Sequence, residues 1–147
     1  MVVQVAASGV GADWLHAQPA LGSLQLLPIV PVTELADAYG AADILVSILE
    51  AEASAFSAPS KVLAYLCAGR PVLLSAPAEN IASRTVMASA GGVVTDPDRD
   101  QALIAAAHAL AASPDLRATM GASARAYAES AFDIRKVASA FEAVLVR

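Results

Sequence analysis

The chain has 147 residues, of which 57% are hydrophobic, and a formal net charge of −5 at pH 7. This length suits one domain with a buried core, and the hydrophobic content excludes a disordered tail. An acidic chain without basic clusters argues against a nucleic-acid surface, because phosphate backbones require several Lys or Arg contacts. No apolar run reaches the roughly 20 residues of a membrane helix, and no basic segment follows Met1, so we expect neither a membrane span nor a secretory signal.

Short apolar runs alternate with longer helical patterns along the first two thirds of the chain. They predict strands at residues 2–6, 24–30, 44–49, 72–75 and 92–95. The segments between them predict helices at residues 12–20, 32–41, 60–68 and 79–89. The last third is predicted to be helical at residues 98–112, 114–131 and 133–146, with Asp98 and Asp133 as N-terminal caps. Gly69 is expected to end the third helix in a left-handed conformation, and Pro71 prevents its continuation.

This alternation indicates βαβ units and an α/β fold, an open parallel sheet with helices on both faces and a helical C-terminal tail. Open sheets of this kind bind ligands beyond the carboxyl ends of their strands. Four loops are predicted there, at residues 7–11, 28–32, 50–60 and 75–80. The loop at 50–60 carries Glu50 and Glu52, and its length makes it a candidate functional segment.

The single cysteine and the two histidines form no recognisable chemical motif. Cys67 has no other cysteine to pair with, which favours the reducing cytoplasm. Its place beside Leu66 in a predicted helix favours a small core residue over a nucleophile. His16 and His108 lack metal-ligand spacing to another His or Cys, so we expect no metal site.

The most informative stretch is residues 58–72, APSKVLAYLCAGRPV. Pro59 and Ser60 suit a helix start, because Pro has no N–H to donate and Ser can cap the free N–H groups of the first turn. Lys61 follows them and is the first Lys or Arg in the chain. A lysine beside the free N–H groups of a helix start suits a bound anion such as a phosphate. A solvated lysine on a first turn explains the local pattern equally well.

Four other residues lie near the ends of predicted strands and helices. Gly9 and Gly11 follow the first predicted strand and would let the backbone approach a phosphate, although two glycines more commonly mark a tight turn. Asp43 precedes the third strand, where a strand-entry residue is favoured over a buried structural carboxylate. Arg70 follows the helix that Ser60 opens and is expected at the opposite end from Lys61, so we place it outside the site.

Four segments together carry a resemblance to a known family: residues 34–43, ELADAYGAAD; residues 58–72; residues 91–94, GGVV; and residues 120–125, MGASAR, with Phe132 ahead of the last helix. In their order and spacing they resemble the C-terminal, nucleotide-sugar-binding domain of retaining GT-B glycosyltransferases of the family 4, or group 1, type. The resemblance implies one half of a GT-B fold, a single Rossmann-like donor-binding domain over residues 1–147. It implies binding of a nucleoside diphosphate sugar for glycosyl transfer to an acceptor.

The resemblance also implies which residues bind the donor. These are Gly9 and Gly11 facing the diphosphate, Ile29 and Val30 near the nucleobase, Ser57, Pro59, Ser60 and Lys61 in the diphosphate and ribose region, and Ala64 at the ribose. The family's E-x7-E signature corresponds here to Phe56 and Ala64, and neither side chain can accept a hydrogen bond from a hydroxyl group. Glu50 and Glu52 are near enough along the loop to substitute.

Members of this family bind the acceptor in a second, N-terminal domain. The resemblance begins after the family's first strand and helix, which carry an Arg and a Lys that neutralise the diphosphate. We therefore expect this chain to act only with an acceptor domain or a partner chain, and to be inactive alone. The expected ligand is a nucleotide sugar, with no metal and no further cofactor, because positive groups stabilise the departing diphosphate. We expect a cytoplasmic protein without a nucleic-acid partner; homo-oligomers, and peripheral membrane association through the missing domain, are compatible with this interpretation.

Two other interpretations stay open. Ala64, Phe56 and the missing basic unit favour a non-catalytic, degenerate or truncated GT-B module that acts in folding or in pairing with a partner. The alternation of strands and helices also fits a flavodoxin-like or receiver-like signalling domain. That third interpretation is less favoured, because no acidic cluster follows the first strand and a fold class does not fix a function.

Overall fold

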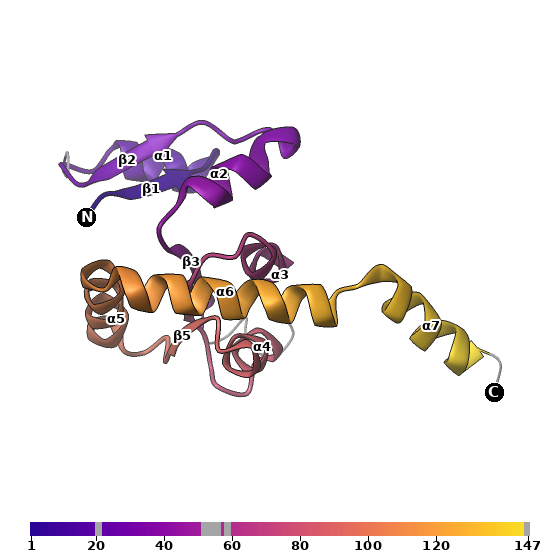
Figure 1. Cartoon of the computed structure of the whole chain (residues 1–147). Coiled ribbons are helices and arrows are strands. Elements are labelled where there is room, and N and C mark those ends of the chain that lie inside the picture. The colour runs from indigo at the N-terminus through magenta and orange to yellow at the C-terminus, as the bar shows by residue number, and fades with distance from the viewer. Residues whose placement is uncertain (20–21, 51–56, 58–59, 146–147) are drawn as a thin grey trace. The chain divides into compact units, whose positions relative to one another are not determined.

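A computed structural model of the chain describes residues 1–19, 22–50, 57 and 60–145. The chain divides into two compact units, Met1–Ala38 and Tyr39–Arg147, and each is described by itself. Figure 1 labels the helices and strands of both. The strands within each unit are parallel and are connected through helices, which confirms the α/β class. A single open sheet through all the strands, and a single domain, remain predictions.

The first unit contains a two-stranded parallel sheet. Strand β1 (Val3–Ala6) pairs with β2 (Leu24–Leu27), and helix α1 (Val10–His16) connects them. Strand β2 ends before Pro28, three residues short of the predicted end, because proline has no N–H for a sheet ladder. A 3-10 turn, η1 (Val32–Glu34), then leads into helix α2 (Leu35–Ala41), which crosses into the second unit.

The second unit contains a three-stranded parallel sheet and most of the helices. Strand order is β3 (Leu45–Ile48), β4 (Val72–Ser75) and β5 (Gly92–Thr95), with β4 in the centre. The helices of this unit are α3 (Ser60–Cys67), α4 (Ile81–Ser89), α5 (Asp100–Ala112), α6 (Pro114–Ala131) and α7 (Ile134–Leu145). These bounds agree with the sequence prediction to within about two residues. Among the helices described, none combines the length and the hydrophobicity needed to span a bilayer.

The core of the second unit lies on one face of its sheet. Leu45, Val72 and Leu74 point to this face, because residues that alternate along paired strands share a side. They form one buried cluster with side chains from α3, α4 and α6: Val62, Tyr65, Leu66, Ala82, Val86, Ala124 and Ala128. On the opposite face α5 packs against β4 and β5, and Leu73 and Leu110 are both almost fully buried.

Two glycines allow α6 to approach the rest of the unit closely. A Cβ atom at Gly121 of α6 would collide with the backbone carbonyl oxygen of Gly69. A Cβ atom at Gly91 would lie 2.7 Å from the Cβ atom of Ala124. Gly69 itself has a φ of +66°, which confirms the left-handed end predicted for α3. Parts of the GGVV and MGASAR segments therefore serve in close packing.

The helix caps agree with the prediction in one case and differ in the other. Asp133 accepts a hydrogen bond from the backbone N–H of Arg135 at 2.9 Å, as an N-terminal cap of α7 should. Asp98 was predicted to cap α5, and this is wrong. The cap position belongs to Arg99, which makes no capping side-chain hydrogen bond. The Asp98 N–H instead donates to the Asp96 carboxylate at 3.0 Å, because Asp96 forms a local turn around Pro97.

The prediction that Cys67 is a core residue is also wrong. Its side chain is exposed at the end of α3, whose buried residues are Val62, Tyr65 and Leu66. The buried residues recur every three to four positions, and Cys67 falls on the other side of the helix.

Candidate functional site

The strands of the second unit end level with one another at their carboxyl edge. Ile48 of β3 is in register with Ser75 of β4, and Ser75 with Thr95 of β5. The ladder continues one step further, since the Leu49 N–H donates to the Ser75 carbonyl at 2.8 Å. Helix α3 follows β3 and helix α4 follows β4, so both helices begin at this edge. A carboxyl edge with free helix N–H groups is where open α/β sheets bind anionic ligands.

Asn80 joins the beginnings of these two helices. Its side-chain oxygen accepts a hydrogen bond from the Ala82 N–H at 2.8 Å and caps α4. Its side-chain nitrogen donates to the carbonyl oxygen of Ser57 at 3.0 Å, three residues before α3 begins. Asn80 is only 5% exposed. The chain entering α3 is therefore tied to the N-terminus of α4. Asn80 lies in one of the predicted carboxyl-edge loops, residues 75–80, but no sequence signal pointed to its bridging role.

The predicted donor residues of α3 lie on its exposed side. Ser60 begins the helix, Lys61 stands in its first turn, and both are exposed. Ala64 is exposed as well, and its spacing of three from Lys61 places the two on one face. Among the ion pairs described for the chain, none includes Lys61. Pro59, Phe56 and Glu52 lie outside the described residues, and Ser57 is half-buried.

The other predicted donor residues belong to the first unit. Gly9 directly precedes α1 with a φ of +80°, a conformation that side-chain-bearing residues rarely adopt. Gly11 lies within the first turn of α1, so it is helical rather than part of the preceding loop. Ile29 is exposed and Val30 half-buried in the segment that follows β2. These residues lie past the carboxyl ends of β1 and β2, as predicted.

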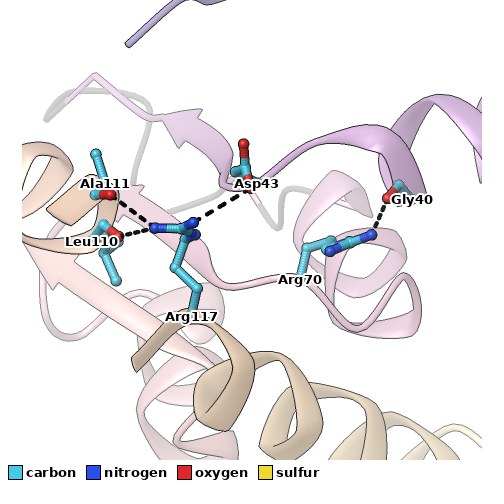
Figure 2. A network of polar contacts seen from close by, with 6 residues as sticks. All are labelled: Gly40, Asp43, Arg70, Leu110, Ala111 and Arg117. Atoms are coloured by element: carbon cyan, nitrogen blue, oxygen red, sulfur yellow. Dashed lines mark hydrogen bonds and ion pairs between the residues drawn. The ribbon is translucent and has the colours of Figure 1, made fainter. Parts of the chain in front are cut away.

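A pocket of about 190 Å³ lies at the opposite, amino edge of the second sheet. Figure 2 shows Arg117 of α6 at this edge, donating to the carbonyl oxygens of Leu110 and Ala111 at 2.8 and 2.9 Å. The same guanidinium lies 3.6 Å from the carboxylate of Asp43. Leu110 and Ala111 are in the last turn of α5, whose carbonyl groups have no partner within the helix. Arg117 thus caps α5.

Two further arginines have the same role at other helix ends. Arg70 donates to the Gly40 carbonyl oxygen in the last turn of α2, also drawn in Figure 2. Arg125 donates to the Cys67 carbonyl oxygen at 2.7 Å, at the end of α3, and pairs with Glu129. The hydrogen bond to Glu129 raises the pKa of Arg125 above its ordinary value. A cation at a helix C-terminus is stabilised by the helix dipole, so these arginines have a structural explanation.

The placement of Arg70 and Asp43 agrees with the sequence analysis. Arg70 lies past the end of α3, away from Lys61, as expected. Asp43 is an exposed strand-entry residue, with a side chain 82% accessible, and not a buried carboxylate. No group of three or more His, Cys, Asp or Glu side chains in the described part of the chain could hold a metal ion.

Comparison with known proteins finds no family model, no curated protein and no solved structure that matches this chain.

Proposed function

We propose that this chain is the donor-binding half of a GT-B glycosyltransferase, which binds a nucleoside diphosphate sugar and acts together with an acceptor domain. In this proposal the chain has the open, Rossmann-like fold of one half of a GT-B enzyme. The observation that carries the proposal is the pair of hydrogen bonds that the Asn80 side chain makes, one to the Ala82 N–H and one to the Ser57 carbonyl oxygen. These bonds tie the N-terminus of α4 to the chain entering α3 at one carboxyl edge.

The chemistry of this edge suits a diphosphate. The helix dipoles of α3 and α4 favour negative charge at their N-termini, and Lys61 adds a full positive charge in the first turn of α3. During transfer, the bond between the sugar and the diphosphate breaks and negative charge grows on the diphosphate oxygens. Fixed N–H groups and an ammonium group stabilise that charge without a metal. Because Lys61 is exposed, it can reach a ligand that lies outside the edge.

A direct test is titration of the chain with UDP, GDP and ADP sugars, followed by calorimetry or ligand-observed NMR. We expect millimolar or tighter binding of one nucleotide class. Lys61→Ala is expected to weaken it about tenfold, as loss of one phosphate contact from a charged group would. Lys136→Ala is the matched control, since Lys136 lies on α7 and donates to the Ser130 carbonyl oxygen. Failure of the unsubstituted chain to bind any of the three classes at millimolar concentration contradicts an autonomous donor site.

A second candidate function is a non-catalytic module that acts in folding or in pairing with a partner. The observation that favours it is Ala64, an exposed alanine at the position where the resemblance implies a ribose-binding glutamate. The Ala64→Glu variant separates the two candidates. A gain in nucleotide affinity supports a donor pocket that lacks one group, whereas no binding by either chain supports the non-catalytic module.

A further inference from the structure

Helix α4 has a buried serine in its first turn. Ser83 is 0% exposed. Its hydroxyl oxygen is a buried side-chain atom that has no hydrogen-bond partner among the residues that the structure describes. Most buried polar side chains in proteins have such a partner, and an unpaired one costs folding free energy. An alanine would fill this position without that cost, so the hydroxyl needs an explanation beyond packing.

The hydroxyl of Ser83 does not use the partners that a helix start usually offers. In a capping box, the third residue of a helix bonds the backbone N–H of the cap residue. The cap residue of α4 is Asn80, whose N–H donates to the Pro77 carbonyl oxygen at 3.0 Å. A helical hydroxyl can also donate to the carbonyl four residues earlier, as Thr85 does to Ile81 at 2.8 Å. Ser83 makes neither bond.

A second buried serine at the other end of α4 is fully explained by the fold. Ser89 is 5% exposed. Its hydroxyl donates to the Val86 carbonyl oxygen at 2.8 Å and accepts a hydrogen bond from the Gly91 N–H at 3.0 Å. Ser89 therefore stabilises the end of the helix. The two serines share a helix and a degree of burial, and they differ in whether the protein supplies a partner.

The unpaired hydroxyl lies at the carboxyl edge of the second sheet. Ser83 is the third residue of α4. The Cα–Cβ bonds of a helix tilt toward its N-terminus, so a side chain lies over the turn that precedes its own Cα atom. For Ser83 this is the segment around Asn80, which also donates to the Ser57 carbonyl oxygen ahead of α3. The Ser83 hydroxyl and the first turn of α3, which carries Lys61, therefore lie at the same edge.

We propose that the Ser83 hydroxyl donates a hydrogen bond to a phosphate oxygen of a nucleoside diphosphate bound at this edge. The inference rests on the proposed function and adds Ser83 to its binding residues. A hydrogen bond from a hydroxyl to an ionised phosphate is strong, and the dipole of α4 favours negative charge at the same place. Because the buried hydroxyl has no partner in the free chain, the bond to the ligand is gained without the loss of another.

Two serine-to-alanine variants of the same helix test this contact. Ser83→Ala removes an unpaired hydroxyl, so the urea midpoint of the free chain should stay the same or rise. Its affinity for the nucleotide sugar should fall about tenfold, as loss of one hydrogen bond to a charged group would produce. Ser89→Ala is the matched control, because it removes two hydrogen bonds at the other end of α4. Its urea midpoint should fall and its affinity should be unchanged.

Calorimetric titration with UDP, GDP and ADP sugars, and then with the matching nucleoside diphosphate, gives these affinities. The loss in Ser83→Ala should persist with the nucleoside diphosphate, because that ligand lacks the sugar and keeps both phosphates. An unchanged affinity in Ser83→Ala, a loss seen only with the nucleotide sugar, or a lowered urea midpoint overturns the phosphate contact. The effect of Lys61→Ala on binding then still supports the proposed function. If the unsubstituted chain binds none of these nucleotides, the proposed function and this inference fail together.

Discussion

Replacement of Asn80 by alanine is the sharpest test of how the carboxyl edge is built. The change removes the cap from α4 and the tie to Ser57 together. Loss of an N-terminal cap costs about 1 kcal/mol, within a range of about 0.5–2. Loss of the second hydrogen bond adds about 1 kcal/mol. Because Asn80 is only 5% exposed, water has little access to the groups left behind, so we expect the free energy of unfolding to fall by about 2 kcal/mol in total.

The Asn80→Asp variant separates the two contributions. Aspartate keeps an oxygen for the Ala82 N–H and is a favourable cap at a helix N-terminus. At neutral pH it has no N–H to donate to the Ser57 carbonyl. We therefore expect Asn80→Asp to lower the free energy of unfolding by only about half as much as Asn80→Ala does.

Urea unfolding followed by circular dichroism at the helix band measures both variants. With a slope of about 1.5 kcal/mol/M, a loss of about 2 kcal/mol lowers the midpoint by about 1.3 M. Hydrogen exchange should show faster opening at the start of α4 in Asn80→Ala and near Ser57 in both variants. A midpoint that Asn80→Ala leaves unchanged, or equal losses in the two variants, would refute this account of the edge.

Two further outcomes follow from packing and from burial. Gly121→Ala should destabilise the fold by about 1–3 kcal/mol, because its new methyl group meets the Gly69 backbone. Gly40→Ala is the control: it lies in a helix with open space around it and should be neutral or stabilising by up to about 1 kcal/mol. Equal urea midpoints for the two variants would contradict the close packing of α6. Burial, and then the nearby Tyr39, raise the pKa of Tyr65 above its ordinary value of 10.0. The neutral phenol is thus favoured in the folded state, so its contribution to stability is complete below pH 10 and is lost as the pH rises through the raised pKa. Tyr65→Phe should flatten the fall in stability between pH 9 and pH 11, and an unchanged slope would show that Tyr65 titrates normally.

Much of the candidate site depends on local signals that the sequence displays. Residues 60–68 carry a helix start, a buried face and a glycine end, and α3 occupies residues 60–67. The same local signals placed β4, β5 and α6 at their observed bounds. These predictions succeed because hydrophobic period, proline and glycine act within a few residues of one another.

Other features depend on groups far apart along the chain. The Asn80 bridge to Ser57 joins residues that are 23 positions apart, and the Arg125 cap of α3 joins residues that are 58 apart. The caps of α2 and α5 by Arg70 and Arg117 are of the same kind, since a guanidinium and a helix end must first be brought together. No local sequence pattern shows which distant carbonyl group a side chain will contact. The bridging role of Asn80 and the capping roles of the three arginines therefore could not be predicted.

The sequence by itself determined the helices and strands of the second unit and the place of Lys61 in the first turn of α3, because these are set by neighbouring residues. Only the tertiary structure decided that Cys67 is exposed and that the Gly69 backbone packs closely against Gly121. The physical reason is that burial and backbone pairing depend on which distant segment lies against a residue, and that segment is chosen only when the whole unit packs.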